Sequence, residues 1–353
     1  MRAVSIFIFF VSLITHLHAQ LSPELTEYYR QVNHAELSLI DSNYNAAIHF
    51  YEEAFDHKKN PFIEDRYNFA VCYAIDQKYD SCYKQLQFVV DKGTSIKIIQ
   101  INPGLALFFS TKYGTNLIEY EIQHKKTYNA IYRSAIDSLT IMDQLFRKKE
   151  GSYSVYGDTI RAIDSMNVIA FNKLVEIYGF PSEELIGVDS SLSGHPQYQS
   201  IIIHQQYVRV GRFFNYSEMI TNALQQGNID AHAAAELIDK SAGSDQFGIF
   251  DAGLVKIVLD STANASSNSS NPKSDYKNVP LGYFKISEEK EKMVNEKRIN
   301  NGLETISEAR QKTIFHLKDP RFLLPSGTIS IFIISEKTDY EKAMDSIILL
   351  KSN

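Results

Sequence analysis

Residues 35–89 carry a 35-residue period, and no other feature of the sequence restricts the fold as strongly. Small and aromatic residues recur at spacings of nine, three and seven, as Ala35, Tyr44, Ala47, Ala54 and again as Ala70, Tyr79, Cys82, Val89. Small residues at such positions let two antiparallel helices pack closely. We therefore expect about two helix pairs over residues 21–93, and a following segment that covers the end of the stack.

This pattern is similar to that of tetratricopeptide repeats, although Ser42 and Gln77 stand where that family usually has glycine in the turn. The resemblance implies a helical repeat module over residues 20–120, with a concave surface for a protein or peptide partner. Cys82 would then be a packing residue. Cys72 and Cys82 are the only cysteines, and they form either a disulfide or two buried free thiols.

The N-terminus has the features of a secretory signal peptide over residues 1–19. Arg2 supplies the positive start, Val4–Thr15 the apolar core, and Leu17-His18-Ala19 a cleavage site. The apolar core is too short for a stable membrane anchor, and no later stretch is long enough to span a bilayer. We therefore expect an exported protein, periplasmic or secreted, without a stable membrane span after signal removal.

Composition and charge exclude some classes of protein. Apolar residues make up 44% of the chain, which suits packed cores. The net charge of −6, from 36 basic and 42 acidic residues, is spread without long runs of one sign. A nucleic-acid partner is therefore not expected, because it would need a basic face.

Helical periodicity continues from Tyr128 to Phe146 and over Thr159–Tyr178, and it predicts a helical domain at residues 121–312. Within it, Phe247–Leu259 and Val279–Ile286 have β-like composition and predict a two-stranded hairpin around a flexible Ser/Asn-rich loop, 260–278. A C-terminal extension, 313–353, adds a possible strand, Thr328–Ser335, and a helix, Tyr340–Leu350. The expected fold is mainly α: tetratricopeptide-like helical hairpins followed by a helical domain with a small β-hairpin.

Polar residues occupy apolar positions of two predicted helices. Asp164 and Asn167 share a face with Phe171 and Leu174, and His204 lies in register between Ile201 and Val208. Buried polar groups need partners, so such positions belong either to a structural network or to a functional site.

An ordered series of short motifs extends this observation over residues 139–304. The series is Asp143-Gln144 with Arg147, Asp164 with Asn167, Gly179-Phe180-Pro181, Ile186-Gly187, His204-Gln205, Asp239, Gln246-Phe247-Gly248, and Arg298 with Gly302-Leu303. It resembles an uncharacterised bacterial domain family. This chain departs from that family's pattern at Lys240, where arginine is usual, and at Phe247, where tyrosine is usual. The resemblance implies candidate residues and no reaction.

The candidate residues suit either binding or acid–base chemistry. His204 would be the acid or base, with Asp143, Asp164 or Asp239 orienting it, and Arg147 and Arg298 would hold an anionic or polar ligand together with Asn167 and Gln246. Asp239 lies at a helix C-terminus, where it calls for Arg147 or Arg298 as a compensating cation, or for solvent and Lys240. The spacing of His204, Asp239 and Asp164 demands no metal, and we expect neither a metal nor a cofactor.

Two main hypotheses follow for the function. The first is an exported binding or interaction protein, in which the repeat recruits a partner and the central domain holds a polar ligand. The second is an enzyme built on His204, although the sequence lacks the HExxH, Gly-x-Ser-x-Gly, phosphate-loop and dinucleotide motifs. A third possibility is that the polar residues only join helices, in which case they pair with each other and leave no cavity.

Overall fold

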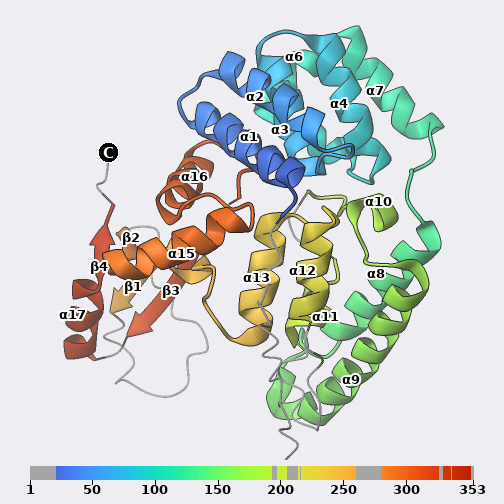
Figure 1. Cartoon of the computed structure of the whole chain (residues 1–353). Helices are drawn as coiled ribbons and strands as arrows, with labels where there is room; N and C mark the ends of the chain where they lie inside the picture. The colour runs from blue at the N-terminus through green and yellow to red at the C-terminus, as the bar shows by residue number, and fades with distance from the viewer. Residues whose placement is uncertain are drawn as a thin grey trace, which may run out of the picture.

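The chain is mainly α-helical, as the sequence predicts. The computed structural model describes residues 21–192, 197–204, 214, 216–259, 280–325, 329–334 and 336–350. Within them lie 17 α-helices and one four-stranded sheet. The predicted signal peptide, the loop 260–278 and Gln205 lie outside the described residues. In Figure 1, α1–α7 lie across the top, α8 and α9 on the right, α12 and α13 in the centre, and the sheet on the left.

Two helical hairpins begin the described chain: α1 (Pro23–Ile40) with α2 (Tyr44–His57), and α3 (Ile63–Ile75) with α4 (Tyr79–Asp91). Their turns are built alike, 35 residues apart. Ser42 and Gln77 both adopt a left-handed backbone, with φ of 56° and 60°. The following amide donates to the carbonyl five residues back in both turns, from Asn43 to Ser38 and from Lys78 to Tyr73. This is the hydrogen bond of a Schellman helix end, here made without the usual glycine.

The next segment covers the second hairpin, as expected for stacked helix pairs. It contains the short helices α5 (Ile96–Gln100), η1 (Pro103–Leu105) and α6 (Ala106–Phe109), and then α7 (Lys112–Gln123), which packs on α4. Cys72 and Cys82 are buried free thiols, so the disulfide alternative does not hold.

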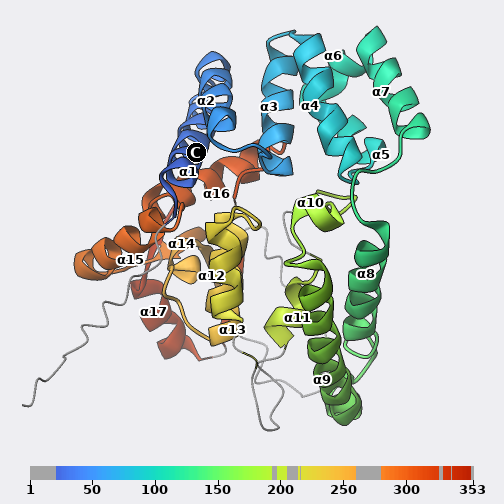
Figure 2. The ribbon, with the colours of Figure 1, turned by 45° about the vertical axis from the view of Figure 1, so that its right-hand side comes forward.

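The central domain begins with a long antiparallel pair, α8 (Ala130–Gln144) and α9 (Ser152–Tyr178). Helix α9 bends at Tyr156, and it ends at Gly179, whose φ is 86°. The chain continues through α10 (Glu183–Ile186), α11 (Gln199–His204), α12 (Ser217–Gln225), α13 (Ala231–Ala242) and α14 (Ile249–Ala252). Figure 2 shows α12 and α13 between α15 and α16 on one side and the α8–α9 pair on the other.

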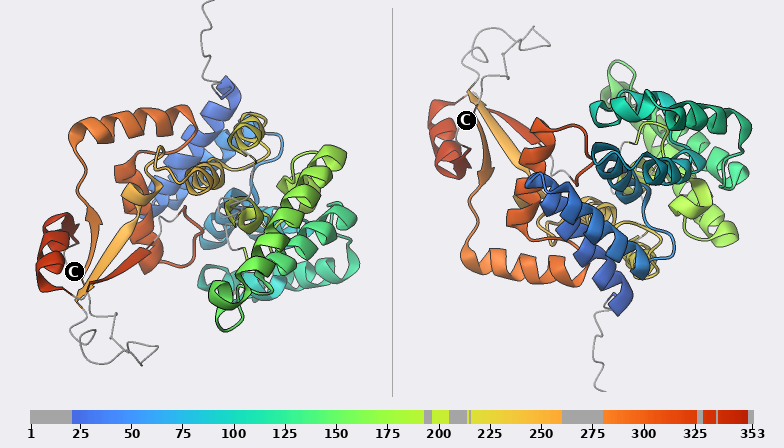
Figure 3. Two further views of the ribbon diagram at one scale, coloured as in Figure 1. Left: turned by 90° about the horizontal axis from the view of Figure 1, so that it is seen from below. Right: turned by 90° about the horizontal axis from the view of Figure 1, so that it is seen from above.

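The β structure is larger than the predicted hairpin. Strands β1 (Leu254–Leu259) and β2 (Leu281–Phe284) pair antiparallel, as predicted, but the first begins seven residues later than expected because α14 precedes it. The tail adds two strands, β3 (Ile329–Ile334), parallel to β1, and β4 (Ile347–Leu349), antiparallel to β2. The order is β3-β1-β2-β4. The predicted final helix, 340–350, is α17 (Lys337–Asp345) followed by β4. Figure 3 shows the sheet and α17 at the opposite end of the molecule from α8 and α9.

The helical hairpins and the helices of the central domain share one hydrophobic core, which extends from Leu21 to Leu324, and the sheet has a separate small core of Val255, Ile257 and Ile347. Helices α15 (Glu288–Asn300) and α16 (Ile306–Lys318) close it, and α16 packs on α1. The boundary predicted at residue 312 therefore falls inside α16. Asn68 exchanges two hydrogen bonds of 2.7 Å with the backbone of Leu323, which ties the C-terminal segment to the first module. None of the helices in the described ranges is long and apolar enough to cross a membrane.

Gly302 is a point of close contact between the two parts. Its φ is 81°, and a Cβ there would lie 2.4 Å from Cδ2 of Tyr29 on α1. We expect Gly302→Ala to lower the free energy of unfolding by about 2–4 kcal/mol, because it adds a steric clash to left-handed backbone strain.

Gly243→Ala is the matched control, since Gly243 has a φ of 60° and nothing within 4 Å of the added Cβ. It should cost only the backbone strain, about 1 kcal/mol. Urea unfolding curves measure both variants. Equal decreases in the free energy of unfolding for Gly302→Ala and Gly243→Ala would contradict the close packing of Tyr29 on Gly302.

Candidate functional site

Four of the predicted residues meet where α8, α9 and α11 come together. We call Asp143, Arg147, Asp164 and His204 the polar cluster. Nδ1 of His204 lies 2.9 Å from both carboxylate oxygens of Asp143. Arg147 bridges the two acids, with Nη1 donating to Asp143 at 3.1 Å and Nη2 donating to both oxygens of Asp164 at 2.8 Å.

Burial distinguishes this cluster from a surface ion pair. The side chains of Asp143 and Asp164 are each 1% exposed, that of Arg147 is 10% exposed, and that of His204 is 22% exposed. The i, i+4 spacing of Asp143 and Arg147 therefore produces a buried pair here, whereas the same spacing on an exposed helix face gives only a weak surface pair. His204, at the end of α11, is the member that reaches toward solvent.

The two acids of the cluster differ in proton affinity. Burial acts to raise the pKa of Asp143, but the hydrogen bond and positive charge of His204, together with Arg147, outweigh it and hold the pKa below its usual value. Burial also acts on Asp164, and there the hydrogen bond from Arg147 only partly offsets it, so the pKa of Asp164 is raised. A carboxylate that stays ionised beside an imidazole can orient it and stabilise its charged form.

Asn167 lies near this cluster but has a local structural contact. It is one helical turn from Asp164 on α9, and its amide donates to the carbonyl of Leu139 on α8 at 3.1 Å. This hydrogen bond joins the two long helices. It accounts for the buried amide without a ligand.

Asp239, Gln246 and Arg298 belong to a different part of the molecule. The carboxylate of Asp239 accepts hydrogen bonds from the amides of Gln246 and Phe247, at 2.9 and 3.0 Å, and from the hydroxyl of Ser244 at 3.0 Å. These donors hold the chain where it leaves α13, so neither Arg147 nor Arg298 supplies the expected compensating cation. Lys240 pairs with Glu236 instead. The side-chain oxygen of Gln246 accepts from Lys297.

Arg298 is fully buried and joins a set of ionisable groups that the sequence analysis did not anticipate. It donates to the carbonyl of Phe247 at 2.8 Å and to Oε1 of Glu304 at 3.0 Å. Glu304 also lies 2.8 Å from Nε2 of His232 and 3.3 Å from Nζ of Lys312. Lys312 pairs in turn with Glu36 on α1. We call Glu36, His232, Arg298, Glu304 and Lys312 the buried ionic network.

The network shifts the proton affinities of its members in both directions. Burial acts to raise the pKa of Glu304, but His232 and Lys312 outweigh it and hold the pKa well below its usual value. Burial acts to lower the pKa of His232, and Glu304 raises it above the usual value. Glu36, with Lys312 as its partner, keeps a raised pKa because burial dominates.

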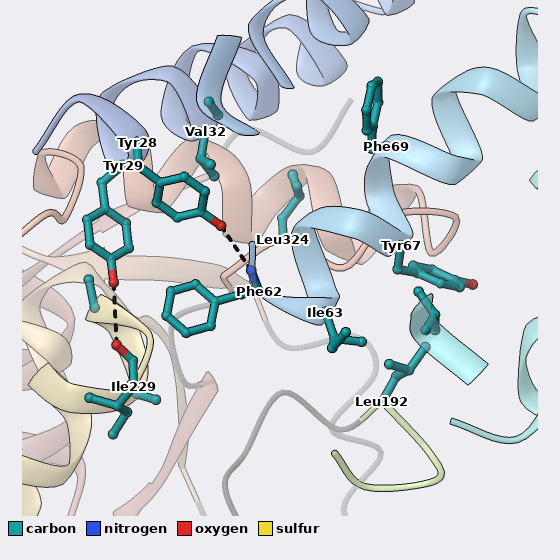
Figure 4. Packing of buried hydrophobic residues seen from close by; sticks show 14 of the residues in the cluster. Tyr28, Tyr29, Val32, Phe62, Ile63, Tyr67, Phe69, Leu192, Ile229 and Leu324 are labelled. Carbon is teal, nitrogen blue, oxygen red and sulfur yellow. Dashed lines mark hydrogen bonds between the residues drawn. The ribbon is translucent and has the colours of Figure 1, made fainter. Parts of the chain in front are cut away.

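This network forms part of the wall of a cavity of about 680 Å³ between the helical hairpins and the central domain. Tyr29, Val32, Asn33 and Glu36 line it from one face of α1, at helical spacing. Phe62 and Ile63 line it from the start of α3, and Leu192 lines it from the segment that follows α10 (Figure 4). Figure 4 also shows two hydrogen bonds: the amide of Phe62 donates to the hydroxyl oxygen of Tyr28, at 3.1 Å, and the hydroxyl of Tyr29 donates to the carbonyl of Ile229, at 3.4 Å. We call this space the central cavity; its size is that of a small-molecule site.

The predicted residues thus do not converge on one cleft. The polar cluster lies outside the lining of the central cavity, and Arg298 is the predicted residue that reaches it. The sequence gives little indication of the cavity, because its walls come from α1, α3, α10, α13 and α16, which lie far apart in the chain. Among the described residues, no group of three or more His, Cys, Asp or Glu side chains is placed to hold a metal ion.

No family model matches the chain, and neither a curated protein nor a solved structure matches it. The resemblances to an uncharacterised bacterial domain family and to tetratricopeptide repeats therefore stay predictions.

Removal of Arg147 should be costly, because it leaves two buried carboxylates without their shared cation. We expect Arg147→Leu to lower the free energy of unfolding by about 3 kcal/mol. Arg161→Leu is the control on the same helix pair, since Arg161 pairs with Asp158, whose side chain is 97% exposed. The free energy of unfolding should fall only slightly in Arg161→Leu. Thermal and urea unfolding compare the two, and similar losses would show that the cluster is solvated.

Stability should fall as the pH rises from about 5 to about 8. Burial raises the pKa of Glu183, a residue of the cavity wall, to about 7. A carboxyl with a raised pKa stabilises the fold below its unfolded pKa, and this stabilisation is lost as the pH passes the folded value. The raised pKa of His232 acts in the same direction over this range.

Glu183→Gln should therefore reduce the dependence of Tm on pH, while its amide oxygen can still accept the 2.9 Å hydrogen bond from the amide of Ile63. Glu184→Gln is the matched control, because the Glu184 side chain is 50% exposed and pairs with Lys92. Identical slopes for wild type and Glu183→Gln would refute the assignment.

Proposed function

We propose that this chain is an exported binding protein that holds a polar ligand in the central cavity. The observation that carries the proposal is the cavity of about 680 Å³ with a buried ionic network in its wall. Ligand sites combine apolar walls with a few convergent polar groups. Here Val32, Ile63 and Leu192 supply apolar surface, and Glu36, Arg298 and Glu304 supply charge. The export rests on the predicted signal peptide.

The position of the cavity supports a role for the helical hairpins in ligand binding. Glu36 and Asn33 of α1 face it from one side, and His232 and Lys312 face it from the other. A ligand in this space contacts both parts of the chain and stabilises their junction. A protein partner on the hairpins is the second element of the proposal, and the hairpin surface that faces the cavity is not available to it.

A thermal-shift screen tests the proposal. Dialysed protein is heated with polar small molecules of positive, negative and zero charge, and a ligand of the cavity should raise Tm in proportion to the logarithm of its concentration. Ala233 is 8% exposed and lines the cavity, so Ala233→Phe should fill part of it and abolish the shift. Ala130→Phe, at the exposed start of α8, should leave the shift unchanged.

Circular dichroism establishes that Ala233→Phe keeps its helical structure, and Ala233→Leu provides a smaller change if it does not. A screen in which no compound of any charge raises Tm contradicts the proposal. So does a shift that both cavity variants retain.

An acid–base enzyme is the second candidate, and the contact of Nδ1 of His204 with both oxygens of Asp143 at 2.9 Å favours it. A buried carboxylate that orients a partly exposed imidazole is a common arrangement for general acid–base catalysis. The test is turnover of anionic esters and phosphoesters. Turnover that is lost in His204→Gln supports this function, and turnover that is absent, or unchanged by the substitution, contradicts it.

A further inference from the structure

The lining of the central cavity contains more acidic side chains than lysine and arginine side chains. Three lysine or arginine side chains of the described residues line it, and each has a carboxylate partner in the same wall: Lys240 with Glu236, Arg298 with Glu304, and Lys312 with Glu36. Five further carboxylates line it without a cation from the lining: Glu64, Asp65, Glu183, Asp189 and Asp230.

Four of these five accept hydrogen bonds from neutral donors. Asp65 accepts from the hydroxyl of Tyr28, and Glu183 from the amide of Ile63. Asp230 caps α13 and Asp189 accepts from the amide of Ser191. These four carboxyl groups are therefore held in place by local structure, and their geometry does not depend on a ligand.

Glu64 is different. Within the part of the chain that the structure describes, its carboxylate has no hydrogen bond and no ion pair. Burial and the neighbouring charges of Asp230, Glu183, Asp65 and Glu36 together raise its pKa well above the usual value. A half-buried acid close to several other acids is unfavourable when ionised, unless a cation enters.

The nearby basic side chains are occupied elsewhere. Nζ of Lys58 donates to the carbonyl of Gly227 at 2.8 Å and lies 4.4 Å from the centre of the Phe62 ring. Nη1 of Arg66 donates to Gln85 at 2.9 Å, and its guanidinium lies 4.0 Å from the centre of the Phe88 ring. Neither side chain lines the cavity.

Two further features of the wall suit a positively charged donor. Oδ1 of Asn33, on the α1 face that lines the cavity, is buried and has no hydrogen-bond partner in the described residues. The rings of Tyr29 and Phe62 also line the cavity, and they stack with their centres 6.3 Å apart. Aromatic faces and acceptors together are the usual surroundings of a bound organic cation.

We propose that the central cavity binds an organic cation, a ligand with a primary amine or guanidinium group, through Glu64 and the oxygen of Asn33 with Tyr29 as the aromatic wall. The proposal rests on the binding function proposed above and names its ligand class. The cation supplies the counter-charge that Glu64 lacks, and its hydrogens satisfy the unpaired acceptor. Apolar parts of the ligand lie against Val32 and Ile63.

Isothermal titration calorimetry tests the inference with five-carbon probes that differ in charge: 1,5-diaminopentane, 1,5-pentanediol and glutarate. Agmatine, arginine amide and spermidine extend the cationic set. We expect at least one cation to bind, and the diol and glutarate to bind at least tenfold more weakly or not at all. Binding should release protons from the wall, because a nearby cation lowers the pKa of Glu64. The measured heat should therefore differ between Tris and phosphate buffers.

Glu64→Gln should weaken binding of the cation at least tenfold and remove much of the buffer dependence. The variant is expected to fold, because it replaces an unpaired buried acid by a neutral amide. Glu24→Gln is the matched control: Glu24 is also in the first turn of a helix but is exposed, and its substitution should leave binding unchanged.

Two results overturn the inference: equal binding of the cation by wild type and Glu64→Gln, or preferential binding of glutarate. A glutarate site that Ala233→Phe abolishes would leave the binding function standing and refute only the ligand class. No binding by any probe in the titration or in the thermal-shift screen would refute both.

Discussion

The ion pair between Lys312 and Glu36 is the contact on which the arrangement of the two parts depends. It joins α16 to α1, and both side chains are almost completely buried, with 1% and 4% exposed. Taking two charges out of water costs several kcal/mol for each, and their attraction compensates only if other polar groups complete the site. Glu304, Arg298 and His232 do so here, since Glu304 alone contacts three positively charged or titrating groups. The helical hairpins are therefore held in one position relative to the central domain.

A fixed junction explains why a cavity exists between parts that otherwise share one core. Apolar packing alone closes such a space, because voids lose contacts on their inner surface. Charged groups in the wall oppose that collapse, and the hydrogen bond from the amide of Phe62 to the hydroxyl of Tyr28 holds the start of α3 against α1. The cavity and the polar cluster are then two separate features. The cavity faces the helical hairpins, whereas the polar cluster holds α8, α9 and α11 together at a distance from the hairpins.

The polar cluster shows what helical periodicity can reveal. Asp164 and His204 were found because each occupies an apolar position of a helix, and both are in contact with Arg147 or Asp143 in the fold. Asp239 and Arg298 belong to the predicted set through the motif series, and they have other surroundings in the fold. The ordered motif series that linked them contains no information about distance, because residues that are neighbours in a series need not be neighbours in space.

The sequence by itself determined local structure: the two helical hairpins with their 35-residue period, the helices predicted over residues 128–146 and 159–178, and the first pair of strands. These features depend on contacts between residues close in the chain, and the type and spacing of those residues determine how strong the contacts are. Only the tertiary structure decided that β3 and β4 enlarge the sheet, that Lys312 reaches Glu36, and that Glu64 lines a cavity without a partner among the described residues. Those contacts join residues up to 276 positions apart. Whether a side chain in such a contact is buried or paired depends on how whole helices pack, and no local sequence pattern predicts that packing.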